Sequence, residues 1–464
     1  MSSFLRPQKP VLVLACLILG IGIFAYEGYQ TFYVTKILGM DLRTPVQTWI
    51  TAIKGSDSGA YLQAAYNFAN GHGLTVCADT TCADGIYRPF IYWGPGTPWI
   101  FGMLMKLTGQ ESMLPFFIFL IVSQAVVAWF AGATVALFTA NPWLRGGTVF
   151  LAALGIPMKI FYFSPGLTSS ENAHLIPFAA FFYFLTKMFC EFWTTQSGST
   201  KAVFRSAGLA GFLLGIVSLI RDSNYQFALF LLVAIPLLAF FRDRTRVKLG
   251  IKVGLLLLVV AFSVRFPVQR WNKKRVGAAI IASSSNLWRE GVWFKHDEAY
   301  WYYEPGFGMA EYLDPSAAAD VAKAYHDHTG GDFYSFRRWL GVIVTNPVRA
   351  LHFKVQRLPI FLGTRPWPDS VVYFISVWCA AFYLLLATYL VRAAVRRTWP
   401  NEVTYLYMVF LGCCLPIIHF EFRYSFPIWF TLPLVPAFLA LQWQAKREAA
   451  SFRGSLPVLN TQES

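Results

Sequence analysis

Long apolar runs, separated by short basic clusters, constrain this chain more than any other feature. A helix needs roughly 17–25 apolar residues to cross a bilayer, and ten runs approach or reach that length: residues 11–34, 113–139, 147–163, 173–190, 206–220, 225–241, 249–266, 371–391, 403–419 and 426–441. Of the 464 residues, 56% are hydrophobic and 14% are charged, against about 45–50% and about 25% in soluble domains. The pattern predicts an all-α multi-pass membrane protein with about ten transmembrane helices. It excludes a soluble globular enzyme and a disordered chain.

The distribution of Lys and Arg predicts how these helices are oriented. Short cytoplasmic loops of membrane proteins are enriched in Lys and Arg. With the N-terminus inside, every strong basic cluster between closely spaced spans falls on the cytoplasmic side, and both termini are cytoplasmic. The clusters are Arg145; Lys187, Lys201 and Arg205; Arg242, Arg244, Arg246 and Lys248; Arg392, Arg396 and Arg397; and Lys446 and Arg447. This asymmetry explains the net charge of +15, so nucleic acid is not an expected partner.

Two long segments, 35–112 and 267–370, are expected to face outward. Within the first, the apolar stretch 99–107 is too short to cross a membrane and predicts an interfacial or re-entrant helix. The second, which divides a module over 1–266 from terminal helices over 371–464, is expected to form a loop or a small domain. Its aromatic residues fit either an interfacial belt or a platform for sugar rings; they are Trp288, Trp293, Phe294, Trp301, Tyr302 and Tyr303.

The cysteines indicate an oxidising environment for the first outer segment. Five of the seven lie in apolar runs, whereas Cys77 and Cys82 stand in the polar sequence CADTTC. Two thiolates, with His72 a poor third ligand, do not make a usual zinc site, so a short disulfide-closed loop is the better interpretation. The His326–His328 sequence HDH, near Asp320 and Asp332, is a weak metal candidate. We expect no metal and no organic cofactor.

Ionisable residues at membrane depth are costly and commonly functional, and here they gather at the outer ends of the predicted helices. The midplane is nearly empty of charge, which favours an outward-facing site at the lipid boundary over a conduction path. Each residue also has a purely structural interpretation, as a helix cap, a lipid-headgroup contact or an ion pair such as Arg221 with Asp222. The residues are Asp57, Arg88, Glu171, Arg221, Asp222, Glu421 and Arg423.

Asp57 begins a predicted helix in the sequence GSDSGAYLQAAYNFANGHG. Apolar residues from Tyr61 onward recur at helical spacing, and Gly71 and Gly73 end the pattern. Ser56 or Asp57 is expected to cap this helix. Capping and catalysis are compatible, because the helix dipole favours a carboxylate at this position.

The order of motifs resembles the C superfamily of glycosyltransferases, which use polyprenyl-phosphate sugars. The resemblance rests on an outer-loop Asp before Tyr-x-x-Ala-Ala, then Gly-x-Gly, Arg-Pro and a Pro-containing turn, with GFLLGIVSLIRD and EFRYSFP later in the chain. It implies a helical-bundle enzyme in which Asp57 is the general base for an acceptor hydroxyl. The acceptor is a lipid, a glycan or a protein, and membrane lipids surround the site.

The resemblance also suggests roles for the other polar residues. Arg88, Arg221 and Arg423 are candidates to neutralise the donor phosphate, with Arg221 preferred. Several members of the superfamily carry paired acidic residues, whereas Asp57 is followed by Ser58. A second carboxylate is therefore expected from Glu171 or Asp222, and further site candidates are Tyr61, His72 and Glu421.

The implied location is a bacterial inner membrane with the site facing the periplasm, or alternatively the lumenal face of the endoplasmic reticulum. An O-antigen ligase or polymerase would share the lipid-linked donor and would place its key residues in the late loop, where Arg270, Arg337 and Arg338 stand. A lipid or polysaccharide transporter is less favoured, because no internal repeat is visible.

Overall fold

The computed structural model describes residues 40–53, 57–77, 82–91, 93–162, 167–194 and 200–277, together with shorter pieces downstream. These pieces are 279, 281, 300–304, 308–312, 341, 344–345, 347–348, 352, 384, 387–388, 391, 432–441 and 443–444. The predicted spans over 11–34 and 403–419 lie outside the described residues, as does nearly all of 371–391.

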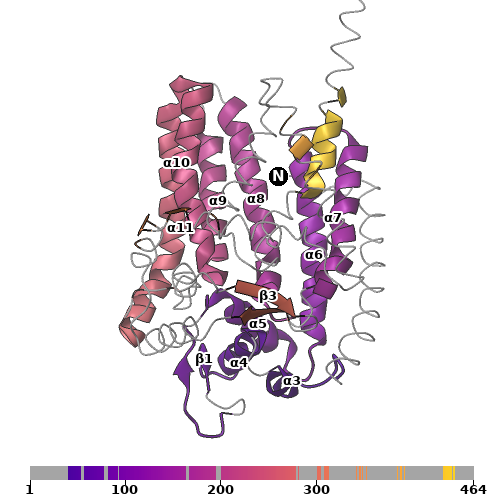
Figure 1. Ribbon diagram of the computed structural model, residues 1–464, viewed down its shortest axis with the longest axis vertical. Helices are drawn as coiled ribbons and strands as arrows, with labels where there is room; N and C mark the ends of the chain where they lie inside the picture. Colours follow the sequence, from indigo (N-terminus) through magenta and orange to yellow (C-terminus); the bar gives the residue numbers. More distant parts are fainter. Residues whose placement is uncertain are drawn as a thin grey trace, which may run out of the picture.

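The described part contains a bundle of six long helices (Figure 1). They are α6 (Leu114–Val135), α7 (Pro142–Tyr162), α8 (Ser170–Thr194), α9 (Lys201–Ile220), α10 (Tyr225–Arg242) and α11 (Val247–Val276). Five candidate membrane spans, over Leu114–Val135, Asn172–Thr194, Lys201–Ile220, Tyr225–Arg242 and Arg244–Val276, have the required length and hydropathy. The predicted class, a multi-pass helical membrane protein, is confirmed. The largest departure is α11, which continues ten residues past its predicted end at Phe266 and carries Pro267 in its interior.

The outward faces of α10 and α11 carry rows of exposed apolar side chains. On α11 they follow a helical spacing of three or four residues: Ile251, Leu255, Val259, Phe262 and Phe266. In water such a continuous apolar surface would be an aggregation liability, whereas hydrocarbon solvates it. These faces are therefore suited to contact lipid.

Glycine pairs bring α9, α10 and α11 into close contact. A Cβ at Gly211 would lie 2.8 Å from the Leu257 carbonyl oxygen, and one at Gly215 would lie 2.6 Å from Val264. Gly250 and Gly254 likewise approach the backbone of α10. Small residues four apart are a usual means of packing helices in membranes, and here they fix α11 against both neighbours.

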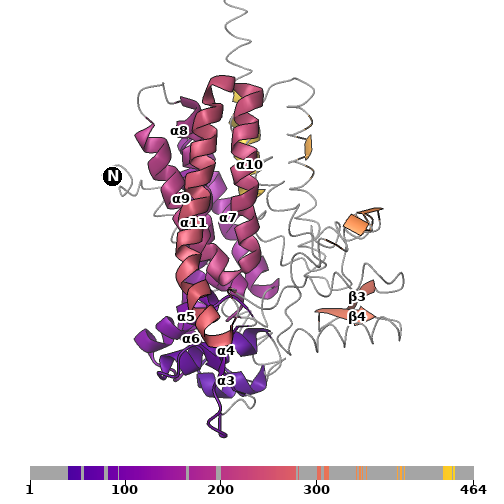
Figure 2. The same ribbon diagram turned by 90° about the vertical axis from the view of Figure 1, so that its left-hand side faces the viewer.

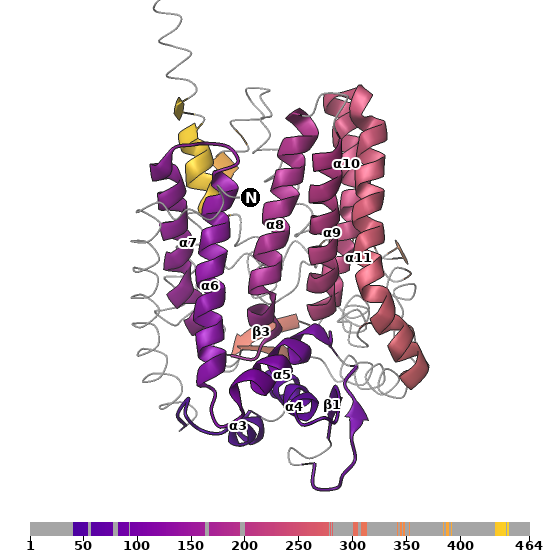
Figure 3. The ribbon, with the colours of Figure 1, turned by 180° about the vertical axis from the view of Figure 1, so that it is seen from behind.

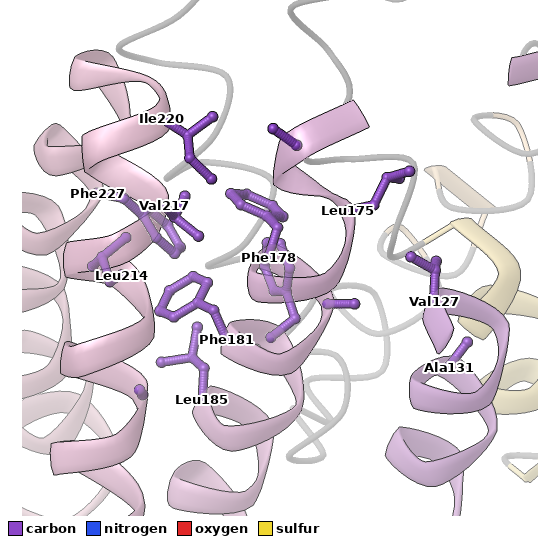
Figure 4. Close-up of a cluster of buried hydrophobic side chains, with 14 of the residues drawn as sticks. Val127, Ala131, Leu175, Phe178, Phe181, Leu185, Leu214, Val217, Ile220 and Phe227 are labelled. Atoms are coloured by element: carbon purple, nitrogen blue, oxygen red, sulfur yellow. The ribbon is translucent and has the colours of Figure 1, made fainter. Parts of the chain in front are cut away.

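An aromatic core joins α8 to α9 and α10 (Figure 4). Phe181 is fully buried and contacts Phe227 edge-to-face at 5.5 Å between ring centroids. Leu214 and Val217 of α9 point toward the same cluster. Interlocking rings resist sliding of one helix along another, so the ends of these helices are held in a fixed relation.

One end of the bundle is covered by three short helices (Figures 1 and 3). They are α3 (Val46–Ala52), α4 (Asp57–Ala69) and α5 (Gly96–Thr108); β1 (Thr75–Val76) and β2 (Arg88–Pro89) pair antiparallel beside α4. With 13 residues, α5 is about 20 Å long and does not reach across a bilayer. It buries Phe101 and Met105 and exposes Trp99 and Leu107, as expected of an interfacial helix.

The helix connections alternate between the two ends of the bundle. The starts of α8 and α10 and the far end of α11 lie with α3–α5, whereas the α6–α7 and α10–α11 connections lie at the opposite end (Figures 1 and 2). Arg145, Arg242, Arg244 and Arg246 belong to that opposite end, which agrees with the predicted clustering. Which compartment each end faces stays a prediction.

Two further pieces complete the described chain. Strands β3 (Tyr300–Glu304) and β4 (Gly308–Tyr312) form an antiparallel pair. Trp301, Tyr302 and Tyr303 of the aromatic stretch therefore lie in a β-strand. Residues from the η6 turn (Leu432–Leu434) onward fall in the predicted last span. There Phe438 contacts Phe138 edge-to-face, with 5.0 Å between ring centroids.

Candidate functional site

The first turn of α4 abuts the segment that leads into α8. Asp57 is the first residue of α4, half-buried, and Ser58 is buried. Thr168 Oγ1 donates a hydrogen bond of 3.1 Å to the Ser58 carbonyl oxygen across 110 residues of sequence. The structure thus brings Asp57 to the start of α8.

Glu171 lies in the first turn of that helix, and its side chain is outside the described part of the structure. One turn further along, His174 is buried, and its Nε2 lies 2.7 Å from the Asn224 side-chain nitrogen. An amide nitrogen can only donate, so this contact assigns the acceptor role to Nε2. Asn224 belongs to the turn that connects α9 to α10, and the bond therefore ties α8 to that turn.

The same turn carries an ion pair that the sequence did not suggest. Arg265 Nη2 of α11 lies 2.5 Å from Asp222 Oδ1, and the two side chains are 6% and 44% exposed. The suggested pairing of Asp222 with Arg221 is therefore wrong, because α11 places its own arginine beside the carboxylate. In the sequence Arg265 falls within the apolar run 249–266, where a lone arginine is itself a signal of function.

Arg265 retains hydrogen-bonding capacity that the described residues do not use. Its Nε and Nη1 atoms are buried and have no hydrogen-bond partner among the described residues, while the guanidinium lies over the Tyr225 ring at 4.1 Å from the centroid. A buried donor without a partner costs about 1–3 kcal/mol, and more when it is charged. A ligand that brings oxygen acceptors would remove that cost, and a planar guanidinium suits carboxylate and phosphate groups best.

The turn that leads into α5 contacts the end of α9, two residues before Asp222 in the sequence. A Cβ at Gly94 would lie 2.3 Å from the Leu219 carbonyl oxygen, and one at Gly96 would lie 2.8 Å from the Ile220 side chain. The Gly94–Pro95–Gly96 turn therefore packs directly on the last residues of α9. Arg221 follows immediately as the residue that ends α9, half-buried, with its N–H donating to the Val217 carbonyl at 3.0 Å.

These contacts link five helices at one end of the bundle, and we call this region the transfer end. Its members are Asp57 on α4, Glu171 and His174 on α8, Arg221, Asp222 and Asn224 after α9, and Arg265 on α11, with α5 packed against α9. Among the described residues, no group of three His, Cys, Asp or Glu side chains could hold a metal ion. The arrangement offers a carboxylate at a helix start and a buried cation with free donors.

Two further predicted site residues are Tyr61, one turn after Asp57 on α4, and Arg88 on β2. Tyr61 is buried in an aromatic cluster, with ring centroids 5.8 Å from Phe90 and 5.6 Å from Trp93. Arg88 is exposed on β2, opposite Val76, and makes no ion pair with any described residue. The structure therefore gives Tyr61 a packing role and keeps Arg88 apart from the Asp222–Arg265 pair.

The remaining candidates divide between a groove and the undescribed residues. His72 follows the end of α4 and stacks on Tyr87, with centroids 4.1 Å apart and 11° between the ring planes. Together with Gln47, Tyr66, Asn67, Asn70 and Cys82, these two residues line a cavity of about 420 Å³, which we call the hairpin groove. Glu421 and Arg423 lie outside the described residues, as do Arg337, Arg338 and the HDH sequence.

The predicted disulfide between Cys77 and Cys82 is confirmed. Asn67 of α4 directs its side-chain nitrogen to the Thr75 carbonyl at 3.0 Å and toward both sulfur atoms at 3.7 and 3.8 Å. Asn67 thus attaches the disulfide itself to α4.

No family model and no curated protein matches this chain. Among solved structures it is similar to the archaeal oligosaccharyltransferase AglB from Archaeoglobus fulgidus, solved in complex with an inhibitory peptide and a dolichol-phosphate. The similarity covers 97% of this chain and 52% of that chain, at 10% sequence identity and a TM-score of 0.46, so the chain spans about half the length of AglB. Fold and site define a multi-pass helical membrane protein with a polar cluster at one end.

Proposed function

We propose that the protein is an integral membrane glycosyltransferase that transfers a sugar from a polyprenyl-phosphate donor at the transfer end. The observation that carries the proposal is Arg265, a buried cation beside Asp222 whose Nε and Nη1 atoms have no hydrogen-bond partner among the described residues. These donors suit a phosphate oxygen. The apolar outer faces of α10 and α11 are suited to the chain of a lipid-linked donor.

In this proposal Arg265 holds the donor phosphate and Arg221 assists it. Asp222 orients the guanidinium through one nitrogen and leaves the other N–H groups for the ligand. The phosphate gains negative charge as it leaves the sugar, so fixed donors stabilise the transition state more than the bound substrate.

Asp57 is proposed as the general base. The acceptor hydroxyl oxygen attacks the anomeric carbon, the bond from that carbon to the phosphate oxygen breaks, and polyprenyl phosphate departs with the electron pair. The acceptor proton passes to Asp57, and a single displacement inverts the anomeric centre. Asp222 is already paired with Arg265, which favours Glu171 as the second carboxylate.

The proposed location is a bacterial inner membrane, with the transfer end toward the periplasm. The Cys77–Cys82 disulfide supports this orientation, because disulfides persist in oxidising compartments and are rare in the cytosol. The lumenal face of the endoplasmic reticulum satisfies the same condition. The acceptor is proposed to be a lipid, a glycan or a protein.

The test compares Asp57→Asn with the matched control Asp84→Asn in purified protein reconstituted in nanodiscs. Asp84 is an exposed carboxylate of the same end module. Transfer is followed from radiolabelled polyprenyl-phosphate sugars to membrane lipid and glycan extracts. We expect Asp57→Asn to lose about 10²–10⁴-fold in rate and Asp84→Asn to keep the wild-type rate.

Equal rates for wild type and Asp57→Asn would remove the base assignment and leave Asp57 as a helix cap. Loss through Arg337→Ala, with Asp57→Asn active, would instead favour an O-antigen ligase or polymerase. If wild-type protein transfers no sugar from any donor, the proposed function itself fails.

A further inference from the structure

We propose that the last turns of α11 bind the phosphate headgroups of anionic phospholipids in the leaflet at the transfer end. These turns comprise residues 267–276, and we call them the basic extension. They carry four exposed cations: Arg270, Lys273, Lys274 and Arg275. None of the four makes an ion pair with a carboxylate in the described part of the chain. The binding of lipid headgroups does not require sugar transfer.

The basic extension lies beyond the part of α11 that fits within hydrocarbon. With 30 residues, α11 is about 45 Å long, whereas the hydrocarbon core of a bilayer is about 30 Å thick. The row of exposed apolar side chains on α11 ends at Phe266, and Arg270 follows about one turn later. The change from apolar to basic residues therefore falls where the helix passes from hydrocarbon into the headgroup layer.

The cations continue the face of α11 that is suited to contact lipid. Arg270 follows Phe266 by four residues, and Lys273 and Lys274 follow Arg270 by three and four residues. Residues at these spacings lie on one face of a helix. A partner that covers the apolar row up to Phe266 therefore also meets the three cations.

Two features direct the cations of the basic extension away from the protein. On its inner side Asn272 is 2% exposed, and its side-chain nitrogen donates a hydrogen bond of 3.5 Å to the Ile281 carbonyl. Pro267 lies inside the helix, where it removes a backbone hydrogen bond, and the turns beyond it tilt away from the bundle (Figures 1 and 3). The inner side is thus held by the protein, and the exposed side is directed to the surrounding membrane surface.

Trp271 and Arg275 place an aromatic ring beside the fourth cation. The Arg275 guanidinium lies over the Trp271 ring, 4.4 Å from the ring centroid. Tryptophan is enriched where a membrane meets water. Stacking uses the flat face of the guanidinium, while its N–H groups lie in the plane and are suited to phosphate oxygens. Both side chains therefore fit the headgroup layer.

The charge of the basic extension is not explained by membrane topology. Lys and Arg are enriched in cytoplasmic loops, whereas the proposed orientation places this end toward the periplasm. Anionic headgroups attract clusters of Lys and Arg that lie next to a transmembrane helix. A soluble acidic protein would match the charge but not the adjoining apolar row. An anionic lipid surface matches both features.

The test is photocrosslinking of the full chain in nanodiscs of phosphatidylcholine and phosphatidylglycerol at 3:1, with p-benzoylphenylalanine in place of Phe266. The mass of each adduct identifies the crosslinked lipid. We expect the ratio of phosphatidylglycerol to phosphatidylcholine among the adducts to be about fivefold above that of the nanodisc. The double variant Lys273→Gln with Lys274→Gln should lower this enrichment at least threefold. Because both side chains are exposed, its midpoint of thermal unfolding should equal that of wild type.

Two control variants distinguish a local site from an effect of net charge. Lys248→Gln with Lys252→Gln removes two exposed cations from the other end of the same helix and should keep the wild-type enrichment. Lys273→Arg with Lys274→Arg preserves the charge of the extension and should keep it as well. Asp57→Asn should also keep it, since loss of sugar transfer concerns only the proposed function.

Four results overturn the inference. The first is an adduct ratio equal to that of the nanodisc, and the second is an unchanged ratio in Lys273→Gln with Lys274→Gln. The third is an equal loss in Lys248→Gln with Lys252→Gln, which would show an effect of net charge alone. The fourth is loss of the enrichment on addition of inorganic phosphate, which would assign the cations to a soluble phosphate ligand.

Discussion

Two Asp–Arg pairs lie at opposite ends of the same helix bundle and differ in how many hydrogen bonds their arginines make. At the transfer end Asp222 pairs with Arg265, whose side chain is 6% exposed. At the other end Asp243 pairs with Arg246 at 2.9 Å, and the Arg246 side chain is 21% exposed. The pairs look alike in composition, but water reaches the second arginine more readily.

The second pair makes further hydrogen bonds within the protein. Arg246 also donates to the Phe192 carbonyl, and Asp243 Oδ1 accepts from the Thr245 backbone N–H at 3.1 Å and hydroxyl at 2.6 Å. The Nε and Nη1 atoms of Arg265 are instead buried and have no hydrogen-bond partner among the described residues. The comparison teaches that an ion pair whose donors have protein partners acts as a structural cap. A buried pair with donors that have no partner is instead a candidate binding site.

The largest expected effect comes from Arg265→Met, compared with Arg246→Met. Loss of a fixed cation at the developing charge of the phosphate should reduce sugar transfer at least 100-fold, while Arg246→Met should leave it within twofold of wild type. The midpoint of thermal unfolding of Arg265→Met should stay equal or rise, because an apolar side chain removes two unsatisfied buried donors and Asp222 remains accessible to water. Wild-type transfer by Arg265→Met would make the two pairs equivalent and remove the phosphate site.

The second effect concerns the close approach of Gly94 to α9. Gly94→Ala places a methyl group 2.3 Å from the Leu219 carbonyl oxygen and should lower the free energy of unfolding by about 1–3 kcal/mol. It should also reduce transfer, because the turn rests beside Arg221. Gly147→Ala in α7, where nothing lies within 4 Å, is the control and should be neutral or slightly stabilising. Thermal unfolding and transfer assays measure the contrast. Equal results for the two variants would contradict the close contact between Gly94 and α9.

A smaller difference is expected between Thr168→Val and Thr245→Val. Thr168→Val removes the buried bond to the Ser58 carbonyl and should destabilise by about 1–3 kcal/mol, with a transfer rate lowered several-fold as α4 shifts. Thr245→Val removes an exposed bond and should change stability by less than about 0.5 kcal/mol. Chemical denaturation of both variants measures the contrast. Equal stabilities would show that α4 and α8 are not coupled through this bond.

The smallest effect is the pH dependence of the Asp243 cap. The pKa of Asp243 lies below its ordinary value of 3.8, chiefly because the Thr245 hydroxyl hydrogen-bonds its carboxylate, with Arg246 adding to the effect. Its contribution to stability is therefore complete above that ordinary value and is lost as the pH falls through the lower pKa of the folded protein. The unfolding midpoint of wild type minus that of Asp243→Asn should be constant from pH 8 to about pH 5 and shrink below pH 4. If the difference grew on acidification, the carboxylate of Asp243 would destabilise the folded protein, contrary to this prediction.

Regular local patterns made several elements predictable. The apolar run that predicted a helix from Tyr225 gave α10 with the same first residue, and Gly71 and Gly73 follow α4 with positive φ angles of 88° and 70°. The short helix α3 was missed, because its buried residues Val46, Trp49 and Ile50 are too few to establish a period. The length of α11 was also missed, because polar residues after Pro267 end the apolar run while the helix continues.

The sequence by itself determined the membrane class, the helical segments, the short interfacial helix and the disulfide, since each follows from composition, periodicity or spacing over a few residues. Tertiary structure decided which polar groups meet. Thr168 hydrogen-bonds the Ser58 carbonyl, and Arg265, not Arg221, pairs with Asp222. Both contacts form because glycine contacts and aromatic packing fix the axial position of each helix relative to its neighbours. The axial position of a helix depends on the packing of the whole bundle, so no local sequence pattern predicts which residues meet at the transfer end.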